Sequence, residues 1–198
     1  WMTLNHNQPV DGYVELKPSE LIWGEEGSSN ELLLESGIVK LMPADKGWQV
    51  NAHSLQLRTN DTAWPDLDVA LDWQPEGWTL NLSQIDVETL LPLAALMPDS
   101  QQSTKLIHDL KPGGLLEDIR VSMGKTIDSL RYSAQLTDGR IAQWYLLPEV
   151  HQLQAKISGS ADIANIHATL IDDTLPYGDV FQAPLNIRHG DVNLVWQM

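Results

Sequence analysis

The sequence predicts a mainly β protein built on one antiparallel sheet with an apolar face and a polar face. From residue 111 onward, apolar and polar residues alternate strictly in one short segment after another. Successive side chains of a strand point to opposite faces, so a period of two indicates strands that are apolar on one side. Turn-forming residues separate the segments, among them Gly124 and the Asp138-Gly139 pair. These two observations predict a meander of antiparallel strands that forms one long amphipathic sheet.

The C-terminal half supplies the clearest elements. We expect strands at 119–123, 130–136, 153–157, 166–170 and around 194–196. Between them we expect turns at Gly124, at Asp138-Gly139, over 159–165, and over 176–178 with Pro184.

The N-terminal half predicts shorter strands. Strands are expected at 13–16 and 21–23, followed by a loop over 24–30. Residues 32–34 and 38–42 predict a hairpin that turns at Ser36-Gly37, and 50–52 and 55–57 predict two strands around a break at 53–54. The alternation of 67–73 and 78–82 around Pro75-Glu76-Gly77 predicts a further hairpin.

The pattern changes to helical spacing at Asp86. The apolar residues of this stretch are Val87, Leu90, Leu91, Ala94 and Ala95. Asp99-Ser100 would start a second helix with a stripe of Leu106, Ile107 and Leu110, and Pro112-Gly113-Gly114 would end it. We expect this helical pair to cover one end or one face of the sheet.

These elements divide the chain into an N-terminal meander (1–85), a helical pair (86–112) and a C-terminal meander (113–198), which we expect to form one continuous domain. The chain starts at Trp1 and stops at Met198 within a strand pattern, which predicts a fragment of a longer protein.

Composition excludes several classes of function. The net charge is -15, with no cluster of lysine and arginine, which argues against a nucleic-acid partner and against docking on an anionic bilayer by charge. The absence of cysteine removes disulfides and thiolate chemistry. No apolar run approaches the roughly 20 residues that a membrane span needs.

No catalytic or metal-binding pattern is present. The six histidines show no HExxH spacing, the carboxylates are dispersed, and no G-x-S-x-G motif occurs. We therefore expect a protein that is not an enzyme and that uses no metal and no cofactor. Eight tryptophans leave one alternative open, a carbohydrate-binding β-sandwich in which indoles stack on sugar rings.

Several segments resemble the central region of the YhdP proteins, which belong to the AsmA-like group together with TamB. The similarity lies in residues 110–114, in Tyr132-Ser133-Ala134, in 147–150 leading into 157–160, and in 192–196. The region from Trp48 to Pro92 is similar to the hairpins that precede this part. Where the family usually has Pro-Gly, this chain has Pro148-Glu149.

The resemblance implies a periplasmic segment of a protein anchored in the inner membrane of a Gram-negative bacterium. It implies a non-enzymatic role in moving phospholipid towards the outer membrane along an apolar β-groove. The expected partners are phospholipid acyl chains and neighbouring strands of the parent protein. The candidate lipid-binding residues are Ile119, Val121, Leu130, Tyr132, Leu136, Leu153, Ile157, Ile166, Leu170, Leu194 and Trp196.

Two alternatives stay open beside the sugar-binding one. The apolar face could be the closed core of an ordinary packed module, or the segment could scaffold envelope assembly without a lipid path. If the sheet edges are unpaired, the isolated chain is also expected to dimerise edge to edge.

Overall fold

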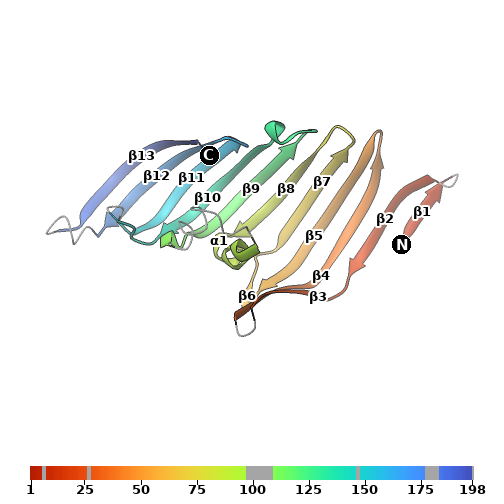
Figure 1. Cartoon of the computed structure of the whole chain (residues 1–198), viewed down its shortest axis with the longest axis horizontal. Helices are drawn as coiled ribbons and strands as arrows, with labels where there is room; N and C mark the ends of the chain where they lie inside the picture. The colour runs from red at the N-terminus through yellow and green to blue at the C-terminus, as the bar shows by residue number, and fades with distance from the viewer. Residues whose placement is uncertain (6–7, 26–27, 97–108, 146–147, 177–182, 198) are drawn as a thin grey trace.

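The protein forms one 13-stranded antiparallel sheet, which crosses the whole molecule from the N-terminal to the C-terminal edge (Figure 1). The structure is a computed structural model, and it describes residues 1–198 except 6–7, 26–27, 97–108, 146–147, 177–182 and 198. The prediction of a mainly β, antiparallel, open sheet is confirmed.

The strands follow one another along the sheet in nearly the order of the chain. The N-terminal ones are β1 (Met2–Asn5), β2 (Gln8–Leu16), β3 (Ser19–Glu25), β4 (Ser28–Ala44), β5 (Gly47–Thr59), β6 (Thr62–Ala63), β7 (Leu67–Gln74) and β8 (Gly77–Asp86). The C-terminal ones are β9 (Gly113–Met123), β10 (Arg131–Ile141), β11 (Val150–Ser160), β12 (Ile163–Leu175) and β13 (Leu185–Gln197). The order of strands across the sheet is β1-β2-β4-β5-β7-β8-β9-β10-β11-β12-β13. Two strands lie off this order: β3 pairs with β4, and β6 pairs with β5.

The long strand β4 corrects two sequence-based expectations. Residues 32–34 and 38–42 are not a hairpin around Ser36-Gly37 but parts of this single strand. Gly37 marks a close approach instead of a turn, because a Cβ there would overlap the side chain of Leu55 on β5. The loop expected over 24–30 is also too long, since β3 continues to Glu25 and β4 begins at Ser28.

Local bulges explain two further wrong predictions. The break expected at 53–54 lies within β5, where Ser54 has a φ of 49° and the register to β7 shifts between Ala52 and Leu55. Asp138, with a φ of 49°, and Gly139 lie inside β10 and do not end it. A bulge inserts one residue without ending the strand, and it increases the local twist. Turn residues within an alternating segment therefore indicated bulges in these two places.

Bulges of the same kind occur in two other strands of the sheet. Asp118 on β9 and Gln152 on β11 have φ values of 50° and 58°, and the register shifts at both. Each bulge adds one residue to the strand, and the apolar/polar alternation of the sequence shifts by one residue at the same place. The apolar side chains therefore stay on one face along the whole strand.

The hairpin of β7 and β8 and the meander from β9 to β13 are confirmed. The turn expected over 159–165 is much shorter, because β11 runs to Ser160 and β12 begins at Ile163. Of the turn expected over 176–178 and Pro184, residues 177–178 lie outside the described residues.

A short helical segment follows β8 in the described part of the chain. It consists of α1 (Val87–Leu90) and the 3-10 turn η1 (Leu91–Leu96), and a second 3-10 turn, η2 (Ile127–Ser129), precedes β10. Asp86 caps α1, since its side chain accepts a hydrogen bond of 2.9 Å from the Glu88 N–H. The second predicted helix lies mostly outside the described residues, although Asp109 and Leu110 are helical. No helix in the described ranges is long and apolar enough to cross a bilayer.

Among the described residues, the buried hydrophobic side chains are few and are spread along the sheet. They are Ala52, Leu67, Ile85, Val150, Ala155, Ala164 and Leu175. This pattern follows from a single layer, in which most side chains keep contact with solvent on one side.

Candidate functional site

The register of the sheet brings apolar side chains from successive strands into continuous rows. One row runs through Leu41, Val50, Leu71, Leu80, Val121, Tyr132, Gly159, Ala164 and Trp196. A parallel row on the N-terminal side contains Val14, Val39, Ala52, Val69, Leu82 and Ile119. Its counterpart on the C-terminal strands contains Ala134, Ile157, Ile166 and Leu194. We call the surface made by these rows the apolar face.

The opposite face is polar along the same strands. The row between the two apolar rows contains Lys40, Asn51, Ala70, Asn81, Arg120, Ser133, Ser158 and Asn165. Its next member on β13 is Val195. A sheet with one apolar and one polar face normally buries the apolar one against another layer or a ligand.

Much of the apolar face is still in contact with solvent. Val121, Tyr132 and Ile157 are half-buried, and Leu194 on β13 is 49% exposed. Large contiguous apolar surfaces are rare on proteins and usually mark binding sites. The chemistry that this surface offers is shape-tolerant burial of apolar groups, and it requires no specific side chain.

The helical segment lies at one end of this face. Here α1 contacts β5, β8 and β9 (Figure 1). The indole N–H of Trp23 on β3 donates to the carbonyl of Pro92 in η1 at 3.1 Å. An ion pair between Glu88 and Arg140 joins α1 to β10 and raises the pKa of the guanidinium, chiefly through the hydrogen bond between the two side chains. The segment is thus fixed to several strands.

The structure places most of the candidate residues together. Ten of the side chains share the apolar face: Ile119 and Val121 on β9, Tyr132 and Leu136 on β10, Leu153 and Ile157 on β11, Ile166 and Leu170 on β12, and Leu194 and Trp196 on β13. Leu130 lies just before β10, outside the strand.

The N-terminal half of the same face was not predicted from the sequence. Val50, Leu71 and Leu80 continue the row that starts from Val121, across β5, β7 and β8. The signal was present, because the alternation in 67–73 and 78–82 predicted a hairpin with one apolar side. The missing step was the pairing of β8 with β9, which joins two stretches separated by the helical segment.

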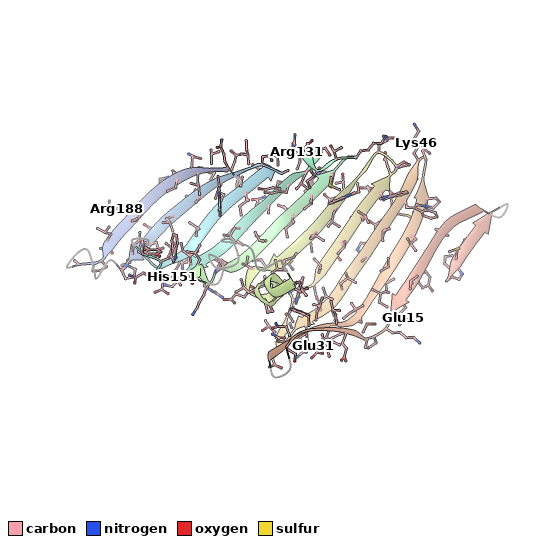
Figure 2. The ribbon with its side chains drawn as sticks, in the orientation of Figure 1. Glu15, Glu31, Lys46, Arg131, His151 and Arg188 are labelled. Atoms are coloured by element: carbon pink, nitrogen blue, oxygen red, sulfur yellow. The ribbon has the colours of Figure 1, made fainter. Side chains whose placement is uncertain are left out.

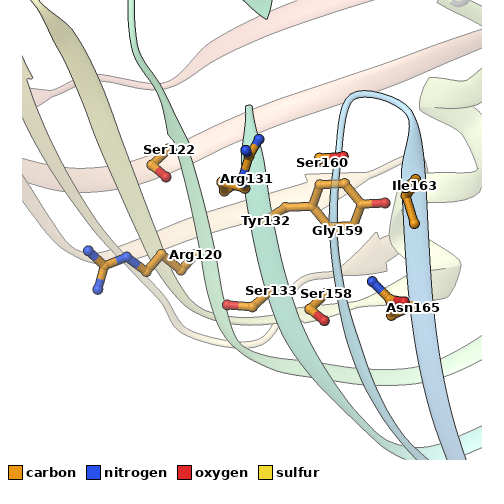
Figure 3. Close-up of a pocket in the computed structure, with 10 residues that line it drawn as sticks. All are labelled: Arg120, Ser122, Arg131, Tyr132, Ser133, Ser158, Gly159, Ser160, Ile163 and Asn165. Carbon is orange, nitrogen blue, oxygen red and sulfur yellow. The ribbon is translucent and has the colours of Figure 1, made fainter. Parts of the chain in front are cut away.

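The polar face carries a shallow hollow of about 530 Å³ over β9 to β12 (Figure 3). Arg120, Arg131, Ser133, Ser158 and Asn165 line it. The two guanidinium groups point away from each other, and the Arg131 group donates to the carbonyls of Asp128 and Leu130 (Figure 3). The hollow therefore offers polar atoms without a convergent set of ligands.

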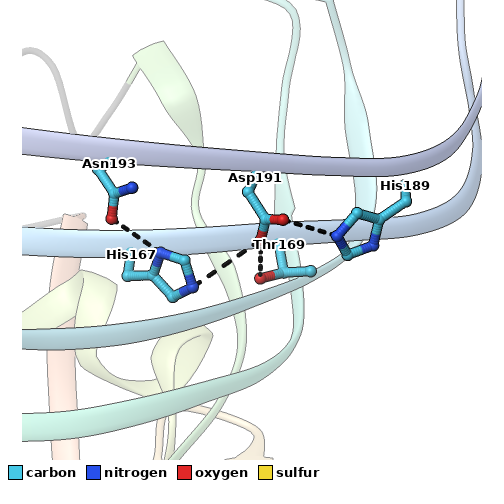
Figure 4. A network of polar contacts seen from close by, with 5 residues as sticks. All are labelled: His167, Thr169, His189, Asp191 and Asn193. Atoms are coloured by element: carbon cyan, nitrogen blue, oxygen red, sulfur yellow. Dashed lines mark hydrogen bonds and ion pairs between the residues drawn. The ribbon is translucent and has the colours of Figure 1, made fainter.

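A second polar cluster joins β12 to β13 (Figure 4). The Asp191 carboxylate lies 2.6 Å from His189 Nε2 and accepts a hydrogen bond of 3.0 Å from the Thr169 hydroxyl. The Thr169 hydrogen bond, with that of His189, lowers the pKa of Asp191 below its ordinary value. The cluster stabilises the pairing of the last two strands. In the described part of the chain no group of three His, Cys, Asp or Glu residues is arranged to hold a metal ion.

Comparisons with known proteins find a matching family and a distant relative. The family model described as "YhdP protein" matches residues 1–198. The chain is 24% identical over 212 residues to the "Intermembrane phospholipid transporter YhdP" of Escherichia coli (strain K12). The alignment covers 99% of this chain and 17% of that relative, so the chain spans less than a fifth of its length. No solved structure matches.

Proposed function

This chain belongs to the YhdP family, and from that premise we propose that it is a segment of a phospholipid transport protein whose apolar face holds acyl chains. The observation that carries the proposal is the continuous apolar row from Leu41 on β4 to Trp196 on β13. A row that crosses the sheet strand by strand gives an acyl chain the same apolar surroundings at every strand.

The free energy of burying acyl chains on the apolar face is compatible with transport. Each CH₂ group that leaves water contributes about 0.8 kcal/mol, so a chain laid on the face is held without any specific contact. Because successive strands offer similar apolar side chains within each row, a bound lipid can shift along the sheet from strand to strand without losing this burial. The face then works as an open groove along the sheet, and the polar face stays in water.

The same premise supports a proposal about location. The E. coli relative is named an intermembrane transporter, which supports a place in the cell envelope. We propose that this segment lies in the periplasm as part of a parent protein anchored in the inner membrane, and that it catalyses no reaction.

The two sheet edges are the proposed contacts with other strands. In the described residues β1 and β13 each pair with a single neighbour, so each has one open side. An open edge presents unpaired N–H and C=O groups that accept another strand. We propose that neighbouring strands of the parent protein pair there, and that in the isolated chain a second copy does so. Light scattering during gel filtration tests this, since a monomer at all concentrations would contradict it.

Native mass spectrometry of the chain purified from bacterial cells tests the function. We expect adducts with the masses of phospholipids. Leu80→Glu, which places a charge on the apolar face, should remove most of them. Asn81→Glu, the matched variant on the opposite face of the same strand, should keep them. A wild-type chain without lipid would contradict the proposal and favour a purely structural module.

A further inference from the structure

We infer that the apolar face is polarised across the strands, with a rim of three tryptophans that binds the glycerol and headgroup region of a phospholipid. The rim consists of Trp48 on β5, Trp73 on β7 and Trp78 on β8, and we call it the tryptophan rim. The inference rests on the proposed function and adds an orientation to it: headgroup at the rim, acyl chains towards α1.

The register aligns the three indoles at one end of the apolar face. Trp48 pairs with Trp73, and Trp73 pairs with Trp78. All three are two residues from members of the apolar row, namely Val50, Leu71 and Leu80, so they point to the same face. Three tryptophans on adjacent strands thus form one row parallel to the apolar row.

The tryptophan rim lies at the boundary between apolar surface and polar turns. Beyond it the chain turns between β4 and β5 and between β7 and β8, where Asp45, Lys46 and Glu76 are exposed. Figure 2 shows Lys46 at the outer end of these strands, where its charge can approach a phosphate. Tryptophan favours such boundaries in lipid systems, since one part of the indole is apolar and its N–H is polar.

The indole N–H groups of the tryptophan rim have no acceptor among the residues that the structure describes. Trp48 and Trp73 are 37% and 46% exposed. Within the described residues, no hydrogen-bond partner is found for the N–H of any of the three indoles. By contrast, Trp23 donates to Pro92 and Trp64 donates to Thr59. The structural tryptophans use their donors internally, and those of the tryptophan rim leave them available for ester or phosphate oxygens.

The other end of the face is more enclosed. Leu67 on β7 and Ile85 on β8 are 4% and 7% exposed, on the strands that lead to α1. From Trp73 to Leu67 the strand covers six residues, which is about 20 Å at a rise of about 3.3 Å per residue. One leaflet of a bilayer has a hydrocarbon depth of about 15 Å, half of the roughly 30 Å core. The space between the tryptophan rim and the enclosed end therefore fits one set of acyl chains lying along the strands.

Fluorine NMR of the 198-residue chain labelled with 5-fluorotryptophan tests this orientation. The signals are assigned with single Trp→Phe variants. Two probes are compared, a phosphatidylcholine with a nitroxide on its headgroup and one with the nitroxide at the methyl end of an acyl chain. We expect the headgroup label to broaden the signals of Trp48, Trp73 and Trp78 more than the acyl label does. The signal of Trp64 is the internal control and should lack this preference.

Affinity gives a second readout. Trp73→Phe and Trp78→Phe keep an aromatic ring and remove the donor, so each should weaken phospholipid binding by about fivefold. Trp64→Phe should leave the affinity unchanged. Stronger broadening of the rim signals by the acyl label, with lipid bound, would overturn the orientation and leave the proposed function intact. A chain that binds neither probe would overturn both.

Discussion

The phenol of Tyr132 on β10 lies over Gly159 on β11, its direct partner across the two strands. A Cβ at position 159 would overlap this ring and also the main-chain oxygen of Ile163. An aromatic residue that covers a glycine on a neighbouring strand supplies the packing that the glycine lacks. The pair therefore keeps the apolar face continuous at a place where one strand has no side chain.

Gly159→Ala is predicted to destabilise the protein. The added methyl group must displace both the main chain at Ile163 and the Tyr132 ring, and overpacking of this kind costs about 1–3 kcal/mol. Gly190→Ala is the matched control, because its nearest contact would be Ile187 Cγ2 at an ordinary 3.4 Å. Urea unfolding of both variants measures the difference. Equal midpoints for the two variants would contradict the proposed packing of Tyr132.

Gln152→Gly is predicted to stabilise the protein, although glycine normally weakens a strand. Gln152 has a φ of 58°, in the left-handed region that costs other residues roughly 1 kcal/mol or more and glycine little. Gln154→Gly on the same strand removes a residue with regular pairing to Thr169 and should destabilise by about 0.5–1 kcal/mol. The two substitutions should thus shift the thermal midpoint in opposite directions. Shifts of the same sign would show that the bulge at Gln152 does not determine the effect.

Trp64→Phe is predicted to cost about 1–3 kcal/mol of stability. The Trp64 indole donates a hydrogen bond of 2.7 Å to the Thr59 hydroxyl, and Thr59 is 2% exposed. Removing the donor leaves a buried hydroxyl with one partner fewer. Trp73→Phe changes the same group at an exposed site and should be nearly neutral for stability. Chemical unfolding compares them, and an equal loss in both variants would contradict the distinction between structural and rim tryptophans.

Asp191→Asn is predicted to reduce the loss of thermal stability that the protein shows when the pH falls from neutral to about 3. The pKa of Asp191 is lowered in the folded protein, first by the Thr169 hydrogen bond and then by that of His189. A carboxyl group with a lowered folded pKa stabilises the fold above its unfolded value of about 4, and this contribution is lost as the pH falls through the folded value. The wild type should therefore exceed the variant in thermal midpoint at neutral pH, and the difference should shrink at about pH 3.

Thr169→Val serves as the companion variant, because it removes the largest cause of the lowered pKa and should reduce the same acid dependence. A wild-type advantage over Asp191→Asn that is equal at both pH values would contradict the role assigned to this carboxylate.

The sequence predicted the fold class because alternation is a local signal that survives in each strand. The prediction failed where glycine can either form a turn or lie inside a strand, at a close contact or next to a bulge. At Gly37 and Gly139 a turn was predicted, but Gly37 makes room for Leu55, and Gly139 follows the bulge residue Asp138 inside β10. Local sequence cannot separate these cases, since the reason for the glycine lies on another strand.

Only part of the apolar face was predicted, because the rest depends on pairing between strands that are distant in sequence. The C-terminal half of the apolar face could be read from continuous alternation, as in Ile119 and Val121. The N-terminal half required the pairing of Leu80 with Val121 across the helical segment, a contact that is distant in sequence. The tryptophan rim depends on register in the same way, because Trp48 and Trp73 face one another only once β5 and β7 are paired.

Photocrosslinking from two adjacent positions of β9 tests the central claim most directly. A benzophenone amino acid replaces Val121 on the apolar face in one variant and Ser122 on the polar face in the other. Both are expressed in cells and irradiated, and the lipid attached to each is identified by mass spectrometry. The account predicts phospholipid adducts from position 121 and few or none from position 122. Equal labelling from both positions, or labelling from neither, would contradict it.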